Sequence, residues 1–233
     1  MCIAASRGSA MMVAVALLML VSAIGLGLVL TTSLEPAMAA ASESSLVALY
    51  GAEAGVSVAA VELADIADWN TVLAGMRRSS TFDANPDGGL TLPDGTAADL
   101  RAFTNTLTCG HAETCTGSEM DAFSTARPWG PNNPRWQLFG AARLDGLLAD
   151  EAGIAPCAIV IWVADDPAEI DGNPLRDMGL LPNGSPGPGS GLLLVRADGF
   201  AARSAHRTVL ATVARPRWNG DPRRSVVAWR ELR

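Results

Sequence analysis

Lysine is absent from this chain of 233 residues, so all of its 17 basic residues are arginines, and 24 acidic residues outnumber them. The formal net charge is -7, and the arginines form no basic run. Proteins that bind nucleic acid or anionic membrane surfaces present clusters of positive charge. The composition therefore predicts no nucleic-acid partner.

Cysteine and aromatic residues are also scarce. Four Cys are too few for a disulfide scaffold but enough for one or two bridges in an oxidising compartment. Hydrophobic residues make up 49% of the chain and charged residues 18%, which excludes a disordered, collagen-like or coiled-coil protein. The length allows one or two domains with a core of ordinary size.

Charge is missing altogether between Arg7 and Glu35, and the segment 10–30 consists almost entirely of Ala, Val, Leu, Met and Ile. As a helix this segment would span roughly 30 Å, the thickness of the hydrocarbon layer of a bilayer. Arg7 precedes it, and the next arginine is Arg77. This asymmetry predicts a cytoplasmic N-terminus and an exported remainder.

Three interpretations of this N-terminal segment stay open. It is a signal-anchor helix, a cleaved secretory signal, or a prepilin leader ending at Gly8 and followed by a retained helix. The stretch 37–39, Ala-Met-Ala, resembles a small-x-small cleavage site. The apolar run, however, exceeds the roughly 7 to 15 residues that the hydrophobic region of a secretory signal needs.

Helical character continues beyond the apolar segment. The stretch 37–73 lacks proline and has few glycines, and its apolar residues recur at spacings of three and four. We expect an amphipathic helix over 35–75 that Pro36 kinks but does not end, and that stops near Gly75. The expected apolar stripe consists of Leu46, Val47, Tyr50, Ala54, Val58, Val61, Leu63, Ile66 and Trp69.

Several stretches resemble PilX-like minor pilins, which assemble type IV pili and are related in layout to the K-type pseudopilins of type II secretion. The similar stretches near the N-terminus are 7–12 (Arg-Gly-Ser-Ala-Met-Met), 31–35 and 50–55, and two further ones are 127–134 and 162–167. The resemblance implies an α+β pilin-like fold. In it, a long N-terminal helix has a transmembrane half and an amphipathic half, and the second half packs on an antiparallel sheet.

The resemblance also implies how such a chain is processed and where it acts. A prepilin peptidase would cut after Gly8, removing residues 1–8, and Ser9 would become the N-methylated first residue. Residues 9–34 would form the transmembrane half of the helix and 35–75 its amphipathic half. Residues 76–233 would form the extracytoplasmic domain. The partners implied are other pilin subunits, the peptidase and the inner membrane, with the pilus as the final location.

One position departs from the pattern of the major pilins, which carry Glu as the fifth mature residue where this chain has Val13. An unpaired carboxylate at membrane depth costs roughly 2.5 to 3.5 kcal/mol on insertion scales. Val13 avoids that cost and also lacks the group that would pair with the terminal ammonium of a neighbouring subunit. We therefore expect a subunit at the filament tip or in an initiating complex.

Two interpretations fit the segment 109–115, Cys-Gly-His-Ala-Glu-Thr-Cys: a zinc site that uses Cys109, His111 and Cys115, or a disulfide between the two cysteines. Zinc takes four ligands, and no second ligand pair lies nearby in the sequence. In an exported domain a Cys109–Cys115 disulfide is the favoured interpretation. Cys157 opens an apolar run and is expected to be a buried free thiol, although pairing with either loop cysteine stays open. Cys2 would lie in the removed leader.

After a loop over 77–94, we expect a short helix over 97–107 capped by Thr96. The remainder favours strands, because short apolar or alternating runs follow one another without long helices between them. On the fourth of these runs, Val209, Ala211 and Val213 would share one face and Thr208, Leu210 and Thr212 the other. The expected strands are 136–142, 157–164, 191–197, 207–215 and 225–232.

The acidic stretch 165–173 is the densest group of oxygen ligands in the chain. Calcium takes six to eight oxygens, and related pseudopilins use it to order such loops, so the resemblance implies a possible calcium site. The spacing does not fit an EF-hand, and a solvated acidic loop is the competing interpretation. The candidate ligands are Asp165, Asp166, Glu169, Asp171 and Asn173.

No catalytic pattern stands out, so we expect a protein that is not an enzyme. The two histidines, His111 and His206, have no nucleophile-elbow serine to serve. The stretch 184–191 is rich in Gly but broken by Pro, and it precedes a strand instead of a helix, unlike a phosphate-binding loop. Four tryptophans fit either a stacking surface for glycans or a partner, or ordinary packing: Trp129, Trp136, Trp218 and Trp229.

A membrane-anchored periplasmic enzyme or binding protein is the alternative function, and a pseudopilin of type II secretion is another. An anchored enzyme should have a flexible linker near residues 35–45, where this sequence looks helical.

Overall fold

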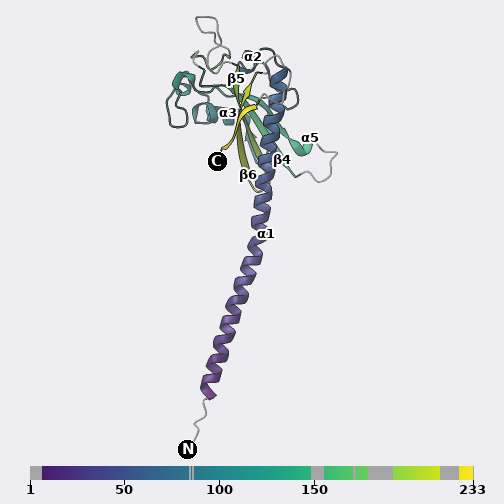
Figure 1. The fold of residues 1–233 in the computed structure, drawn as a ribbon, viewed down its shortest axis with the longest axis vertical. Coiled ribbons are helices and arrows are strands. Elements are labelled where there is room, and N and C mark those ends of the chain that lie inside the picture. Colours follow the sequence, from purple (N-terminus) through teal and green to yellow (C-terminus); the bar gives the residue numbers. More distant parts are fainter. Residues whose placement is uncertain are drawn as a thin grey trace, which may run out of the picture. The chain divides into compact units, whose positions relative to one another are not determined.

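A computed structural model describes residues 7–83, 85, 87–147, 155–169, 172–177, 191–215 and 226–232 (Figure 1). The chain divides into two compact units at the boundary between Glu43 and Ser44. Helix α1 (Arg7–Asp65) crosses this boundary without a break and contains Pro36. The prediction that helical character continues past the apolar segment is therefore confirmed.

The expected end of this helix near Gly75 is wrong, because α1 ends at Asp65 and only the short helix α2 (Asn70–Leu73) follows. Trp69 lies in the segment that connects the two helices. Its fully buried indole donates a hydrogen bond from Nε1 to the carbonyl of Leu63, at 2.8 Å, which holds the connecting segment against the end of α1. Gly75, with a φ of +68°, instead follows α2.

Five antiparallel strands form the main sheet of the second unit, in the order of the chain (Figure 1). They confirm the α+β class and all five expected strands, whose ends shift by a few residues. The largest difference is at β5, which continues to Ala201 where the sequence predicted an end at 197. The strands are β3 (Gln137–Arg143), β4 (Cys157–Asp165), β5 (Leu192–Ala201), β6 (Ala205–Ala214) and β7 (Val226–Leu232).

The segment before this sheet differs from the expectation of a loop over 77–94 and a helix over 97–107. Strand β1 (Gly89–Thr91) pairs with β2 (Ala97–Asp99), and helix α3 (Leu100–Cys109) begins three residues late. The Pro-Asp-Gly sequence forms a tight turn that closes a hairpin, in which Leu92 donates to the carbonyl of Thr96.

The cap of α3 also differs from the expected Thr96. The carboxylate of Asp99 accepts a hydrogen bond from the amide of Ala102 at 2.9 Å. Three short helical elements that the sequence analysis missed complete the described chain: α4 (Gly117–Met120), the 3-10 helix η1 (Gly130–Asn132) and α5 (Leu144–Leu147).

The sheet is covered on both faces at β4, every residue of which is buried. One face packs against the part of α1 that belongs to the second unit, and the other packs near β3 and β4 against α3, β1 and β2. On β6, Val209, Ala211 and Val213 lie in the first of these cores, which confirms the expected alternation. The residues of α1 in that core are Ala52, Val56, Ala59, Ala60 and Leu63.

The expected apolar stripe of α1 is wrong in part, since Leu46, Tyr50 and Val61 are 47%, 62% and 53% exposed. The buried face consists instead largely of small residues, among them Ala48 and Ala52. Small side chains let the helix backbone come close to the sheet, and large ones on this face would prevent that approach.

Gly199 of β5 lies at the point of closest approach. A Cβ atom on residue 199 would overlap the backbone carbonyl of Ala48 and would come within 2.9 Å of the amide nitrogen of Ala52. Because both obstacles are backbone atoms, a changed side-chain rotamer cannot relieve the overlap. The absence of a side chain at Gly199 is therefore a requirement of this packing.

We predict that Gly199→Ala lowers the free energy of unfolding by about 2–3 kcal/mol, because the helix must shift away from the sheet. The measurement is chemical unfolding of the full chain in detergent, followed by tryptophan fluorescence. Gly117→Ala is the matched control, since a Cβ at that position meets nothing within 4 Å. Equal stability of the Gly199→Ala variant and the wild type would refute the close approach.

Candidate functional site

The N-terminal part of α1 carries the residues expected for anchoring and processing. The segment Ala10–Gly27 has the length and composition of a membrane span, and none of it is buried. A signal sequence would have the same properties. The stretch Glu35–Asp65 also meets these criteria, but its later part is buried as the core helix of the second unit.

The expected processing site lies at the start of α1. Gly8 and Ser9 belong to its first turn, while residues 1–6, including Cys2, lie outside the described part of the chain. Val13 is 59% exposed within the first unit. Nothing in the geometry of this turn tests cleavage or methylation, which stay predictions.

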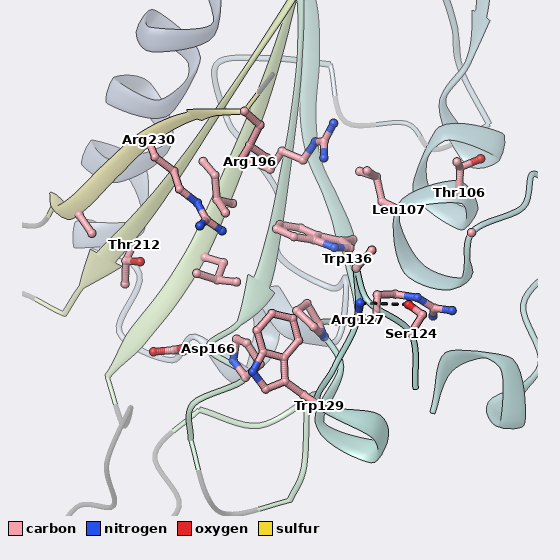
Figure 2. Close-up of a pocket in the computed structure, with 18 of the residues that line it drawn as sticks. Thr106, Leu107, Ser124, Arg127, Trp129, Trp136, Asp166, Arg196, Thr212 and Arg230 are labelled. Atoms are coloured by element: carbon pink, nitrogen blue, oxygen red, sulfur yellow. Dashed lines mark hydrogen bonds between the residues drawn. The ribbon is translucent and has the colours of Figure 1, made fainter. Parts of the chain in front are cut away.

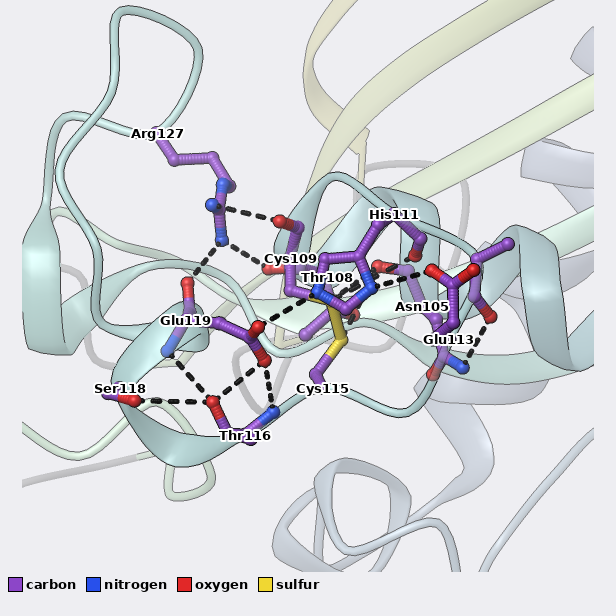
Figure 3. Close-up of polar contacts among 11 residues, drawn as sticks. Asn105, Thr108, Cys109, His111, Glu113, Cys115, Thr116, Ser118, Glu119 and Arg127 are labelled. Carbon is purple, nitrogen blue, oxygen red and sulfur yellow. Dashed lines mark hydrogen bonds and ion pairs between the residues drawn. A yellow bond between two sulfur atoms is a disulfide. The ribbon is translucent and has the colours of Figure 1, made fainter.

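The second expected feature, the Cys109–Cys115 disulfide, is present (Figure 3). Both sulfur atoms are used by this bond, which removes the zinc interpretation for the oxidised protein. Cys157 is buried and free, as expected. Burial, with a smaller contribution from the charge of Asp145, raises the pKa of the Cys157 thiol to about 11, so it is unreactive at neutral pH.

Arg127 holds the disulfide loop in place, and the sequence analysis missed this role. Its guanidinium donates to the carbonyls of Thr108 (2.6 Å), Cys109 (3.2 Å) and Glu119 (3.1 Å), as Figure 3 shows. Across the loop, His111 lies between the carboxylates of Glu113 and Glu119, at 3.2 and 3.4 Å. These contacts join the end of α3, helix α4 and the segment that follows α4, so they stabilise this part of the fold.

The acidic stretch brings only some of the expected ligands together. Asp165 and Glu169 are each 1% exposed, and their carboxylates lie within 4.8 Å of each other and of Asp177, which the sequence analysis did not include. The amide of Asn132 donates to the carbonyl of Glu169 at 2.7 Å and so fixes the turn that carries it.

The remaining expected ligands lie apart from this group or outside the description. The Asp166 carboxylate accepts a hydrogen bond from the amide of Ala168, and Asn173 accepts one from Leu175, so both serve their own turns. Asp171 lies outside the described residues.

The three buried carboxylates fit a calcium ion in part. Asp165 and Glu169 offer the hard oxygen ligands that calcium takes. Asp177 is already engaged, because its Oδ2 accepts from Arg215 at 2.9 Å and its Oδ1 from the amide of Gly191 at 2.7 Å. Three carboxylates also supply fewer than the six to eight ligands of a calcium site unless carbonyls or waters complete the shell.

The second histidine has a structural environment. His206 stacks on Phe200 with ring centroids 4.6 Å apart, and its Nε2 faces both Asp198 and the Thr208 hydroxyl at 3.4 Å. Burial by itself would raise the pKa of Asp198, but hydrogen bonds from His206 and Arg196 hold it below its ordinary value. Because one nitrogen faces both groups, this arrangement lacks the relay geometry of a catalytic triad.

A groove of about 840 Å³ lies on the sheet face that points away from α1 (Figure 2). Its floor is formed by β5, β6 and β7, and its walls by the end of α3, the segment 124–136 and the turn after β4. Three of the four tryptophans noted in the sequence line it: Trp129, Trp136 and Trp229. Trp218 lies outside the described residues.

Comparison of the chain with protein-family models, with curated proteins and with solved structures gives no match. The geometry by itself shows a pilin-like layout, in which the later half of a long N-terminal helix packs on an antiparallel sheet.

The acidic cluster generates a prediction about calcium. If an ion binds Asp165 and Glu169, millimolar calcium raises the melting temperature of the full chain above its value in a chelator, because the ion binds only the folded state. Thermal unfolding in both conditions measures this shift. Glu169→Gln should abolish the shift, whereas Glu53→Gln, on α1, should leave it intact. Superimposable curves for the wild type in both conditions would remove calcium from the account.

Proposed function

We propose that this protein is a minor pilin, a subunit of a type IV pilus-like filament that prepilin peptidase processes between Gly8 and Ser9. Its role is assembly and not catalysis. The inner membrane holds it as a single-pass protein with a periplasmic C-terminal domain, and the filament then takes it up. Its partners are the peptidase and other pilin subunits, which it contacts through the N-terminal helix.

One observation carries this proposal: α1 joins a fully exposed apolar segment to the core of the folded domain without a break. The described part of the chain does not cover Ala10–Gly27, and lipid or the helices of other subunits would provide that cover. From Ser44 onward the same helix is part of the domain core. A filament subunit needs both properties in one helix, since that helix leaves the membrane with the domain attached.

Val13 supports a position at the tip or in an initiating complex. An interior subunit gains from a carboxylate that pairs with the terminal ammonium of its neighbour, and Val13 cannot form this pair. A subunit with no neighbour above it has no terminal ammonium to pair with, so it loses nothing by having Val instead of Glu at position 13.

The alternative of a membrane-anchored enzyme or binding protein has less support. It would be served by a flexible linker near residues 35–45, and this stretch is helical. The groove on the sheet fits a binding role within either proposal. A pseudopilin of type II secretion would share the layout and differ in its partners.

The test is mass spectrometry of the mature N-terminus in cells with and without prepilin peptidase, together with sheared filaments. We expect the wild-type chain to begin at methylated Ser9, to keep residues 1–8 when the peptidase is absent, and to be far less abundant in filaments than the main subunit. A start at Ala40 would show a cleaved secretory signal, and a start at Met1 in both strains a plain anchor. Either result contradicts the proposal.

A further inference from the structure

The groove on the outer face of the sheet has a floor that is set by strand register. Arg196 of β5 pairs with Leu210 of β6, which pairs with Arg230 of β7, so all three side chains point to the face away from α1. Leu194 and Thr212 form the next row in the same way. The floor is therefore a patch of mixed apolar and polar side chains, and no described helix covers it.

The two wall tryptophans present indole surfaces to this floor. Figure 2 shows Trp129 and Trp136 on the same side of the groove, facing the strands. Trp129 is 41% exposed and Trp136 half-buried, and neither indole N–H has an acceptor among the described residues. Exposed indoles with unused donors offer a flat apolar surface and a hydrogen bond to the same ligand.

Charge in the groove is divided between two sides. The guanidinium of Arg196 is held by Asp198 at 2.9 Å, and that of Arg127 by carbonyls of the disulfide loop. Arg230 is exposed and, within the described chain, has no partner; in Figure 2 its guanidinium extends from β7 over the floor. On the other side, Asp166 contributes a carboxylate from the turn after β4.

These side chains define the ligand that the groove can hold. Three strand spacings separate β4 from β7, about 14 Å, so a ligand that reaches both Asp166 and Arg230 is longer than a single sugar ring. Stacking surfaces, a hydroxyl at Thr212 and a carboxylate suit a polyhydroxylated ligand, and a free guanidinium suits a carboxylate on that ligand. The groove volume is within the range of small-ligand sites.

We propose that this groove binds a short oligosaccharide that bears a carboxylate, such as one that contains uronic acid. The sugar rings stack on Trp129 and Trp136, Asp166 and Thr212 bind hydroxyl groups, and Arg230 pairs with a carboxylate. The proposal does not depend on the role in a filament.

Two other ligand classes fit less well. A peptide strand cannot pair with β5 or β6, because their backbones already pair with neighbours on both sides. The edge strand β7 could accept one, but a strand added there would lie beside the floor and not on it. A nucleic acid needs several free cations, whereas Arg230 is the one that the described residues offer to the groove, in a chain of net charge -7.

The test is isothermal titration calorimetry on the full chain in a polyoxyethylene detergent, which has no sugar headgroup to compete. The probes are tetrasaccharides of galacturonate, alginate and hyaluronan, with maltotetraose as the neutral comparison and tetraglutamate as the peptide comparison. The variants are Trp129→Ala and Arg230→Gln. Arg77→Gln is the matched control, because Arg77 is exposed and does not line the groove.

We expect at least one acidic tetrasaccharide to bind in preference to maltotetraose. Trp129→Ala should weaken that binding at least about tenfold, and Arg230→Gln about tenfold while removing the preference for the acidic sugar. Arg77→Gln should change nothing. Both variants alter exposed side chains, so circular dichroism should show an intact fold.

Three results would overturn the proposal. In the first, none of the acidic tetrasaccharides gives saturable heat. In the second, binding survives both variants unchanged, so that it occurs elsewhere on the chain. In the third, tetraglutamate binds as tightly as the best sugar, which would make the groove a site for acidic peptides.

Discussion

The close approach of α1 to β5 is the constraint on which the rest of the second unit depends. With no side chain at Gly199, the carbonyl of Ala48 comes to the surface of the sheet, and the small residues of the helix pack into the space between the strand side chains. This packing commits one face of the sheet to the helix. The groove and the disulfide loop are therefore found on the opposite side, where α3 covers only part of the sheet.

The sequence predicted the elements well where one signal was sufficient. The continuous apolar run of β4 and the alternation of β6 each specify a strand by themselves, and the short spacing of Cys109 and Cys115 favoured the disulfide that the structure shows. The end of α1 and its buried face were not predictable, because both depend on distant partners. Trp69 looked like a further residue of the helical stripe. In the structure it lies beyond the end of α1, and its buried indole donates a hydrogen bond back to the carbonyl of Leu63.

The candidate sites likewise combine features that a local sequence signal predicts with features that depend on distant partners. The acidic stretch was visible, yet its third buried carboxylate, Asp177, joins it only through folding, with Arg215 as a partner from beyond β6. The sequence marked Arg127 only as the first residue of the stretch 127–134 that resembles minor pilins. Its contacts with the disulfide loop depend on the path of the chain and could not be predicted. The tryptophans could be read as stacking residues or as core, and the path of the segment before β3 places two of them, Trp129 and Trp136, in the wall of an open groove.

Hydrogen exchange of the backbone amides in the full chain, read by mass spectrometry, tests most directly whether the later half of α1 is part of the domain. Because the packing makes the helix and the sheet one cooperative unit, amides of Ser44–Asp65 should exchange as slowly as those of β4. Exchange of the helix well before β4 would show that it opens independently, and would contradict the account.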